Sequence, residues 1–137
     1  TKKDQESHFQ AIIEDLNVDL LVLARYMQIL SEEFCKQLQG RAINIHHSFL
    51  PSFAGSKPYH QAYERGVKVI GATAHYVTPE LDAGPIIVQE VRPITHETTA
   101  EQMVHLGHDI ETTALCQAVR LHCEDRVQIN GKRTVIL

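Results

Sequence analysis

The segment around residue 44 combines side chains that can catalyse a reaction at a carbonyl group. Asn44, His46 and His47 come at the end of a short β-branched and apolar run, and a segment containing Ser and Pro follows. We therefore expect them near the C-terminal end of a buried strand, where open α/β sheets place their ligands. Because side chains alternate along a strand, Asn44 and His46 should share one face.

These residue types suit proton transfer beside a polarised carbonyl. The amide of Asn44 can donate to a carbonyl oxygen, and the imidazole of His46 can exchange a proton near neutral pH. Asp82 lies in the turn-rich segment 78–85, and its carboxylate could fix the imidazole tautomer or stabilise the charged imidazole. The spacing leaves open which of His46 and Asp82 accepts the proton.

A zinc site is the alternative for the same part of the chain. His46, His47, His60, His75 and Asp82 are all possible ligands of a metal-dependent hydrolase. However, adjacent histidines on a strand point to opposite faces, and the chain contains no H-E-x-x-H signature. We therefore expect a site without a metal.

Several motifs resemble the folate-dependent formyltransferase fold. They are Asn44-Ile45-His46, Ser48-Phe49-Leu50-Pro51, Gly55 and Asp82-Ala83-Gly84. The pair His46-His47 and the run from Lys57 to Gly66 look most like one branch, the formyltetrahydrofolate deformylases, because the transferase branches usually have proline at the position of His47. The resemblance covers residues 19–137. It implies an α/β domain of Rossmann type, with a mainly parallel sheet flanked by helices.

The resemblance also implies an activity and a set of site residues. The reaction would be hydrolysis of 10-formyltetrahydrofolate to tetrahydrofolate and formate, which supplies formate for purine biosynthesis. Water and the folate would be the substrates, with no separate cofactor. The catalytic residues would be Asn44, His46 and Asp82, and the folate-binding residues would be Met27, Gln28, Ile29, Leu30, His47, Val77 and Thr78.

The residues alone leave alternatives to these roles. The apolar segment 27–30 could simply cap the core, and His47 could reflect a packing difference. Formyl transfer to glycinamide ribonucleotide is the second enzymatic hypothesis, because the Asp82-Ala83-Gly84 turn also occurs in transferases. A non-catalytic folate-binding module is the third.

The resemblance further implies that residues 1–137 form the C-terminal part of a catalytic domain. On this resemblance, we expect the N-terminal half of that domain and a regulatory domain to lie outside residues 1–137. Members of this branch often form oligomers, so we expect a homo-oligomer, and the C-terminal hairpin is a candidate contact.

Composition argues against two other classes of partner. The 137 residues include 13 Lys and Arg against 17 Asp and Glu, giving a net charge of −4, and no basic cluster exceeds two adjacent residues. Nucleic acid is therefore a disfavoured partner. No apolar stretch approaches the length of a membrane span, and three cysteines without C-x-x-C spacing suit reduced thiols, so we expect a cytoplasmic protein.

Hydrophobic periodicity predicts the elements that position the site residues. We expect helices over residues 5–16, from Ser31, over 58–66 and over 99–123, the last with a capping box from Thr98 to Glu101. We expect strands over residues 18–24, 42–46, 67–77 and 86–94. A C-terminal hairpin over residues 127–137 should turn at Asn130-Gly131.

Overall fold

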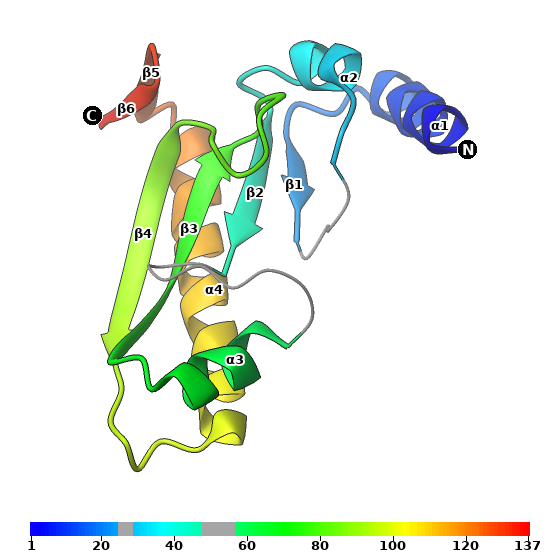
Figure 1. Ribbon diagram of the computed structural model, residues 1–137. Helices are drawn as coiled ribbons and strands as arrows, with labels where there is room; N and C mark the ends of the chain where they lie inside the picture. Colours follow the sequence, from blue (N-terminus) through cyan, green and yellow to red (C-terminus); the bar gives the residue numbers. More distant parts are fainter. Residues whose placement is uncertain (25–28, 48–56) are drawn as a thin grey trace.

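The computed structural model describes residues 1–24, 29–47 and 57–137. The elements, shown in Figure 1, are α1 (Lys2–Asp15), β1 (Leu21–Leu23), α2 (Glu32–Gln37), β2 (Ala42–His46), α3 (Pro58–Arg65), β3 (Val69–Tyr76), β4 (Ile86–Pro93), α4 (Ala100–Cys123), β5 (Val127–Asn130) and β6 (Arg133–Ile136). All the predicted helices and strands are present, with boundaries shifted by a few residues.

A four-stranded mixed sheet in the order β1-β2-β3-β4 forms the centre of the molecule. β1 and β2 pair in parallel, whereas β3 runs antiparallel to both of its neighbours, β2 and β4. Three of the four strands thus run in one direction, but only one of the three pairings is parallel. For β3 and β4 the reason is local, because their connection is too short for the helical crossover that a parallel pair needs. The α/β class and the C-terminal hairpin β5-β6 are confirmed.

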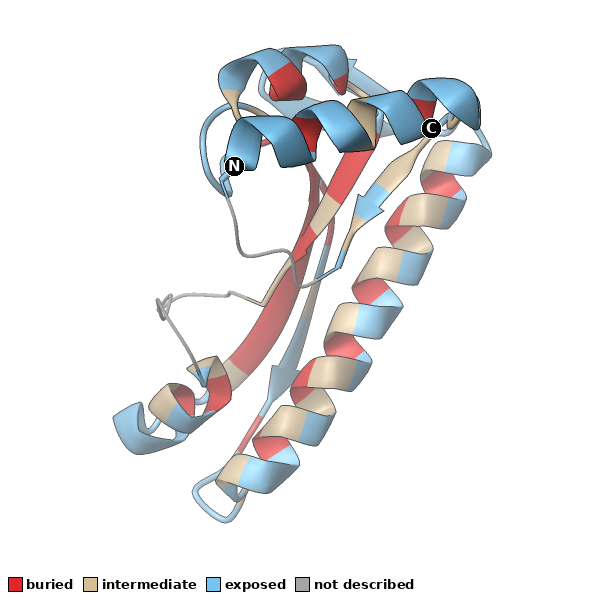
Figure 2. Cartoon of the chain, turned by 90° about the vertical axis from the view of Figure 1, so that its right-hand side faces the viewer, coloured by how far each residue is buried: buried red, intermediate tan, exposed pale blue. Residues whose placement is uncertain are grey.

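Helix α4 covers one face of the sheet, with its buried residues turned toward the strands (Figure 2). Met103, Ile110, Ala114 and Leu121 are buried as the periodicity predicts. The helix begins one residue later than expected: Thr99 is the N-cap, and its capping-box partner is Gln102 instead of Glu101. The sheet and α4 thus enclose the larger of two apolar clusters.

The smaller apolar cluster lies where α1 and α2 meet the start of β2. It consists of Ile13, Leu30, Phe34, Cys35, Leu38 and Ala42. β1 is shorter than the strand predicted over residues 18–24. It is also less buried than predicted, since Val22 is 39% exposed. β1 is an edge strand of the described sheet, so no neighbouring strand covers it on its outer side. Ile12 of α1 and Leu16, which caps the C-terminal end of this helix, are also exposed.

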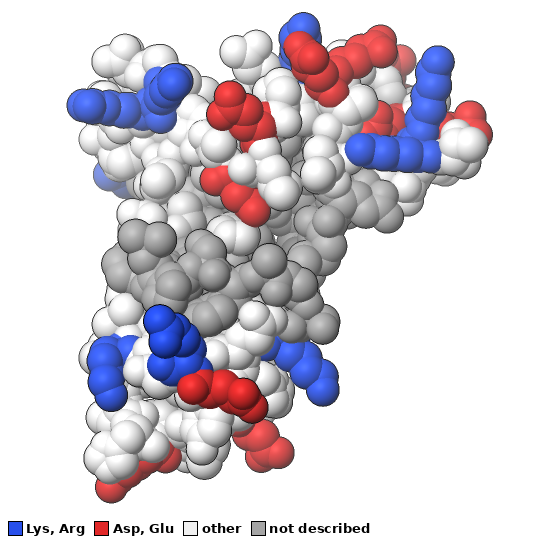
Figure 3. All heavy atoms as spheres, in the orientation of Figure 1, with Lys and Arg blue, Asp and Glu red and all other residues white. Residues whose placement is uncertain are grey.

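The surface carries both signs of charge. On the face drawn in Figure 3, Lys and Arg side chains lie in several small groups, with Asp and Glu side chains near them. Among the helices that the structure describes, none has the length and apolar character needed to cross a membrane.

Candidate active site

The two faces of β2 divide its residues between the core and the candidate site. Ile43 and Ile45 are buried in the cluster that α4 covers, whereas Asn44 and His46 are only half-buried. This alternation confirms that Asn44 and His46 share the opposite face of the strand. The antiparallel register of β3 then adds residues of that strand to the same face, because Asn44 lies opposite His75 and His46 lies opposite Thr73.

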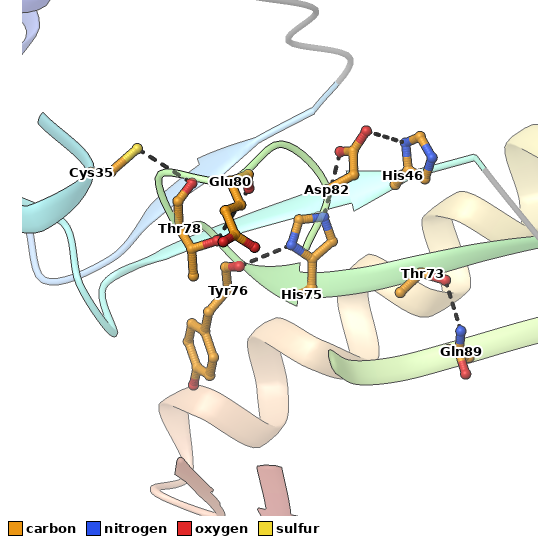
Figure 4. Close-up of polar contacts among 9 residues, drawn as sticks. All are labelled: Cys35, His46, Thr73, His75, Tyr76, Thr78, Glu80, Asp82 and Gln89. Carbon is orange, nitrogen blue, oxygen red and sulfur yellow. Dashed lines mark hydrogen bonds and ion pairs between the residues drawn. The ribbon is translucent and has the colours of Figure 1, made fainter. Parts of the chain in front are cut away.

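Asp82 reaches this face from the connection between β3 and β4. Its Oδ2 atom lies 3.4 Å from Nδ1 of His46, and its Oδ1 atom lies 3.7 Å from Nε2 of His75 (Figure 4). One carboxylate therefore faces two imidazoles from neighbouring strands. Asp82 adopts a φ of 53°, in the left-handed region that aspartate tolerates better than most residues.

Gly84 brings the Asp82 connection close to β3. A Cβ atom on Gly84 would lie 1.6 Å from the carbonyl oxygen of Tyr76, so only glycine fits without a backbone shift. The N–H of Tyr76 donates to the carbonyl of Pro85 at 3.0 Å, which ties the end of the connection to the same residue. These backbone contacts place the Asp82 carboxylate over β2 and β3.

The electrostatic surroundings of His46 favour its neutral form. Burial lowers the pKa of His46 below its ordinary value of 6.5, while the Asp82 carboxylate acts in the opposite direction. His47 and His75 lower the pKa further, and Glu111 raises it. Because an ionised carboxylate only accepts hydrogen bonds, we place the proton of neutral His46 on Nδ1, facing Asp82. Nε2 then carries the lone pair and can accept a proton.

His75 is a site residue whose orientation the sequence left open. It is 4% exposed, and its Nδ1–H donates to the carbonyl oxygen of Tyr76 at 2.9 Å. Nε2 of His75 and Oδ1 of Asn44 are buried and have no hydrogen-bond partner among the described residues. The signal that could have identified His75 is its register opposite Asn44, which is set by strand pairing and is not visible in local sequence.

The predicted folate-binding residues have different surroundings. Met27 and Gln28 lie outside the described residues. Leu30 is buried in the smaller apolar cluster, which is the core-capping alternative, whereas Ile29 is 53% exposed. Val77 packs against the same cluster, and its N–H donates to the carbonyl of Ala42. Thr78 is half-buried, with its hydroxyl donating to the carbonyl of Glu80.

His47 is half-buried directly after β2, and its ring lies 5.2 Å from that of His46. The alternative zinc ligand His60 is exposed on α3. In the described parts of the chain, no group of three or more His, Cys, Asp or Glu side chains is arranged to hold a metal ion.

Comparison with known proteins identifies the relatives of the chain. Residues 1–119 match the model of a protein family described as formyl transferase. The chain belongs to this formyl transferase family. The formyltetrahydrofolate deformylases of Corynebacterium sp. (strain P-1) and Escherichia coli (strain K12) are 55% and 48% identical to it over 137 residues. All of the chain is covered, but it spans only 48% and 49% of those two relatives, about half of their length.

Solved structures of formyl transferase relatives show two degrees of similarity. A formyltetrahydrofolate deformylase from Burkholderia mallei matches with a TM-score of 0.94 at 52% identity, covering 100% of this chain and 49% of the other. A phosphoribosylglycinamide formyltransferase from Anaplasma phagocytophilum matches with a TM-score of 0.85 at 38% identity, covering 95% and 64%. Within the formyl transferase family, the resemblance to the deformylase branch is confirmed.

Proposed function

We propose that this chain carries the catalytic site of an enzyme that hydrolyses 10-formyltetrahydrofolate to tetrahydrofolate and formate. The observation that carries the proposal is the contact between His46 and Asp82 beside Asn44, on the face of β2 turned away from α4. High identity to proteins named formyltetrahydrofolate deformylase supports the choice of reaction.

The proposed reaction begins with a water molecule near Nε2 of His46. His46 accepts a proton as the water oxygen attacks the formyl carbon, and the amide of Asn44 donates to the oxyanion that develops. The bond between the formyl carbon and N10 of the folate then breaks. The proton returns to N10, so formate and tetrahydrofolate leave without net oxidation or reduction.

Asp82 holds His46 in the tautomer that this reaction needs. The carboxylate accepts from Nδ1–H and stabilises the imidazolium that forms during the attack. General-base assistance typically contributes roughly 10²- to 10⁴-fold, and one oxyanion donor about 10²- to 10³-fold. These contributions are sufficient for a formamide whose leaving nitrogen is attached to an aromatic ring, without a metal or a covalent nucleophile.

The remaining parts of the proposal concern the whole protein. Residues 1–137 would form the C-terminal part of the catalytic domain, which is consistent with matches to half of each relative. The proposed folate contacts remain Met27, Gln28, Ile29, Leu30, His47, Val77 and Thr78. We propose a cytoplasmic homo-oligomer that supplies formate for purine biosynthesis, with no nucleic-acid or membrane partner. The mixed charges in Figure 3 support the absence of a nucleic-acid partner.

Formate release from 10-formyltetrahydrofolate by the full-length protein tests the proposal. The measurement is made with and without glycinamide ribonucleotide, for the wild type, Asp82→Asn and the control Glu80→Gln. Glu80 is exposed in the same connection as Asp82, so its substitution changes the local charge without touching the site. We expect Asp82→Asn to lower the rate at least about 10²-fold.

Release without an acceptor, lost in Asp82→Asn and retained in Glu80→Gln, supports the hydrolase. Formyl transfer that requires the acceptor identifies a transferase instead. Folate binding with no turnover under either condition identifies a binding module.

A further inference from the structure

A half-buried hydrogen bond connects α3 to α4 beside the candidate active site. The hydroxyl of Tyr59 donates to Oε2 of Glu111 at 2.7 Å, and Tyr59 is only 7% exposed. The side chain points toward α4, and a hydrogen bond to a carboxylate is stronger than one between neutral groups.

The absence of a side chain at Gly107 allows the Tyr59 ring to pack against α4. A Cβ atom at Gly107 would lie 2.0 Å from Cζ and 2.3 Å from the hydroxyl oxygen of Tyr59, so the ring lies against the helix backbone. Glu111 follows one turn later on the same side of α4, which places its carboxylate at the end of the ring. The absence of a side chain at position 107 and the acceptor at position 111 together fix the orientation of Tyr59.

The Tyr59 ring also lies near His47, which in turn lies beside His46. The ring centroid of Tyr59 lies 6.3 Å from that of His47, and His47 lies 5.2 Å from His46. His108 of α4 meets Tyr59 edge-on, with centroids 6.3 Å apart. The aromatic contacts therefore run from α4 through Tyr59 and His47 to the proposed general base. Local sequence patterns do not predict these contacts, because they join three separate elements.

We propose that Tyr59 and Glu111 are positioning residues that hold the His47 ring beside His46, where His47 retains the water that attacks the formyl carbon. This inference rests on the proposed hydrolytic function. His47 is half-buried and follows the last residue of β2, so no strand pairing fixes its side chain. The packing of Tyr59 supplies that constraint, and the negative charge of Glu111 also raises the pKa of His46.

The test uses kcat and KM for formate release by the full-length protein. Tyr59→Phe keeps the packed ring and removes only the hydroxyl. Tyr63→Phe is the matched control, because Tyr63 lies on the same helix and is exposed. We expect Tyr59→Phe to lower kcat about tenfold, the effect of losing one hydrogen bond to a charged group, with little change in KM. Glu111→Gln should retain more activity than Glu111→Ala, because its amide oxygen can still accept.

A double-mutant cycle separates positioning from general destabilisation. If Tyr59 acts through His47, Tyr59→Phe should have no further effect on kcat in the His47→Ala background. Independent, additive losses of kcat would overturn the inference, as would a Tyr59→Phe enzyme with wild-type kcat. Urea unfolding curves that show Tyr59→Phe to be folded under the assay conditions exclude unfolding as the cause of a lower rate.

NMR signals of the His47 ring, measured without substrate, test the positioning role independently of the proposed hydrolysis. We expect the His47 ring signals to shift in Tyr59→Phe and in Glu111→Ala, and to remain unchanged in Tyr63→Phe. An inactive wild type with these shifts would refute hydrolysis while preserving the contact. Unchanged His47 signals in an active enzyme would refute the positioning role alone.

Discussion

Asn44 of β2 lies directly opposite His75 of β3, and each carries a buried polar atom without a hydrogen-bond partner among the described residues. Leaving such atoms unpaired costs free energy, about 1–3 kcal/mol for each group. Both side chains lie on the face that Asp82 approaches, with His75 in direct contact with its carboxylate. We infer that a substrate group or a water molecule pairs with these atoms during turnover.

Replacing His75 should therefore reduce activity more than stability. His75→Gln removes the Nε2 atom with which we infer that a substrate group or water pairs, and we expect formate release to fall about 10- to 100-fold, the range for losing a buried polar partner. The steady-state rate is compared with that of His60→Gln, since His60 is exposed on α3. Equal rates for the two variants would show that His75 has no role in the site.

The pH dependence of the reaction should reflect the low pKa of His46. Because burial lowers this pKa, the base stays neutral at pH values below 6.5, and the acid limb of kcat/KM should have its midpoint below 6.5. Asp82→Asn removes a contribution that raises the pKa, so the His46 midpoint should move to still lower pH. Titration of the His46 ring by NMR in both proteins measures the two midpoints, and an upward shift in the variant would contradict the assignment.

The same pKa shift has a consequence for stability. The unfolded imidazole binds a proton at higher pH than the folded one, so the unfolded state carries more protons in the interval between the two pKa values. The contribution of His46 to the free energy of unfolding is therefore present above about pH 6.5 and is lost as the pH falls through this interval. Urea titrations of the wild type and His46→Asn between about pH 7.5 and about pH 5.5, about one unit either side of 6.5, should converge toward low pH.

Gly84→Ala should disrupt both the site and the fold around it. The new Cβ atom would overlap the carbonyl oxygen of Tyr76, so the backbone that positions Asp82 has to move. We expect a loss of about 1–3 kcal/mol in the free energy of unfolding, typical of overpacking, and at least about a tenfold loss of formate release. Gly66→Ala is the control: its φ of 71° makes alanine strained, but no atom lies within 4 Å of the new Cβ, so activity should persist.

Tyr76→Phe should show the opposite pattern, with lower stability and retained activity. The Tyr76 hydroxyl hydrogen-bonds Nδ1 of His122 at 2.6 Å, on the face of the sheet that α4 covers. Removing it should cost about 1 kcal/mol in the free energy of unfolding. Urea unfolding of Tyr76→Phe and of the exposed Tyr63→Phe checks this difference, and an inactive Tyr76→Phe would place the hydroxyl in the catalytic machinery.

Local patterns in the sequence predicted the parts of the fold that depend on neighbouring residues. The alternation of residues 43–46 placed Asn44 and His46 on one face, and the apolar stripe of α4 predicted which of its side chains are buried. The prediction that Asp82 lies close to His46 came from the motif resemblance more than from local periodicity. The close contact that resulted agrees with it.

Features that depend on distant pairing were not predictable in the same way. The inward orientation of His75 follows from the antiparallel register of β3 against β2, and the burial of Tyr59 follows from Gly107 on a helix far along the chain. The exposure of Val22 depends on β1 having a neighbouring strand on one side only in the part of the sheet that the structure describes. Each of these outcomes is determined by tertiary neighbours that a single sequence window does not contain.

The pairing of β2 with β3 also protects the protein against a specific misfolding error. A slip of one residue would exchange the two faces of β3, turning Tyr76 toward Asp82 and His75 toward α4. Such a slip would also remove Ala74 and Tyr76 from the apolar cluster and leave an imidazole in their place. Chains with the slipped register would therefore also lack a stable core, so the free energy of folding itself selects the arrangement that brings His46, His75 and Asp82 together.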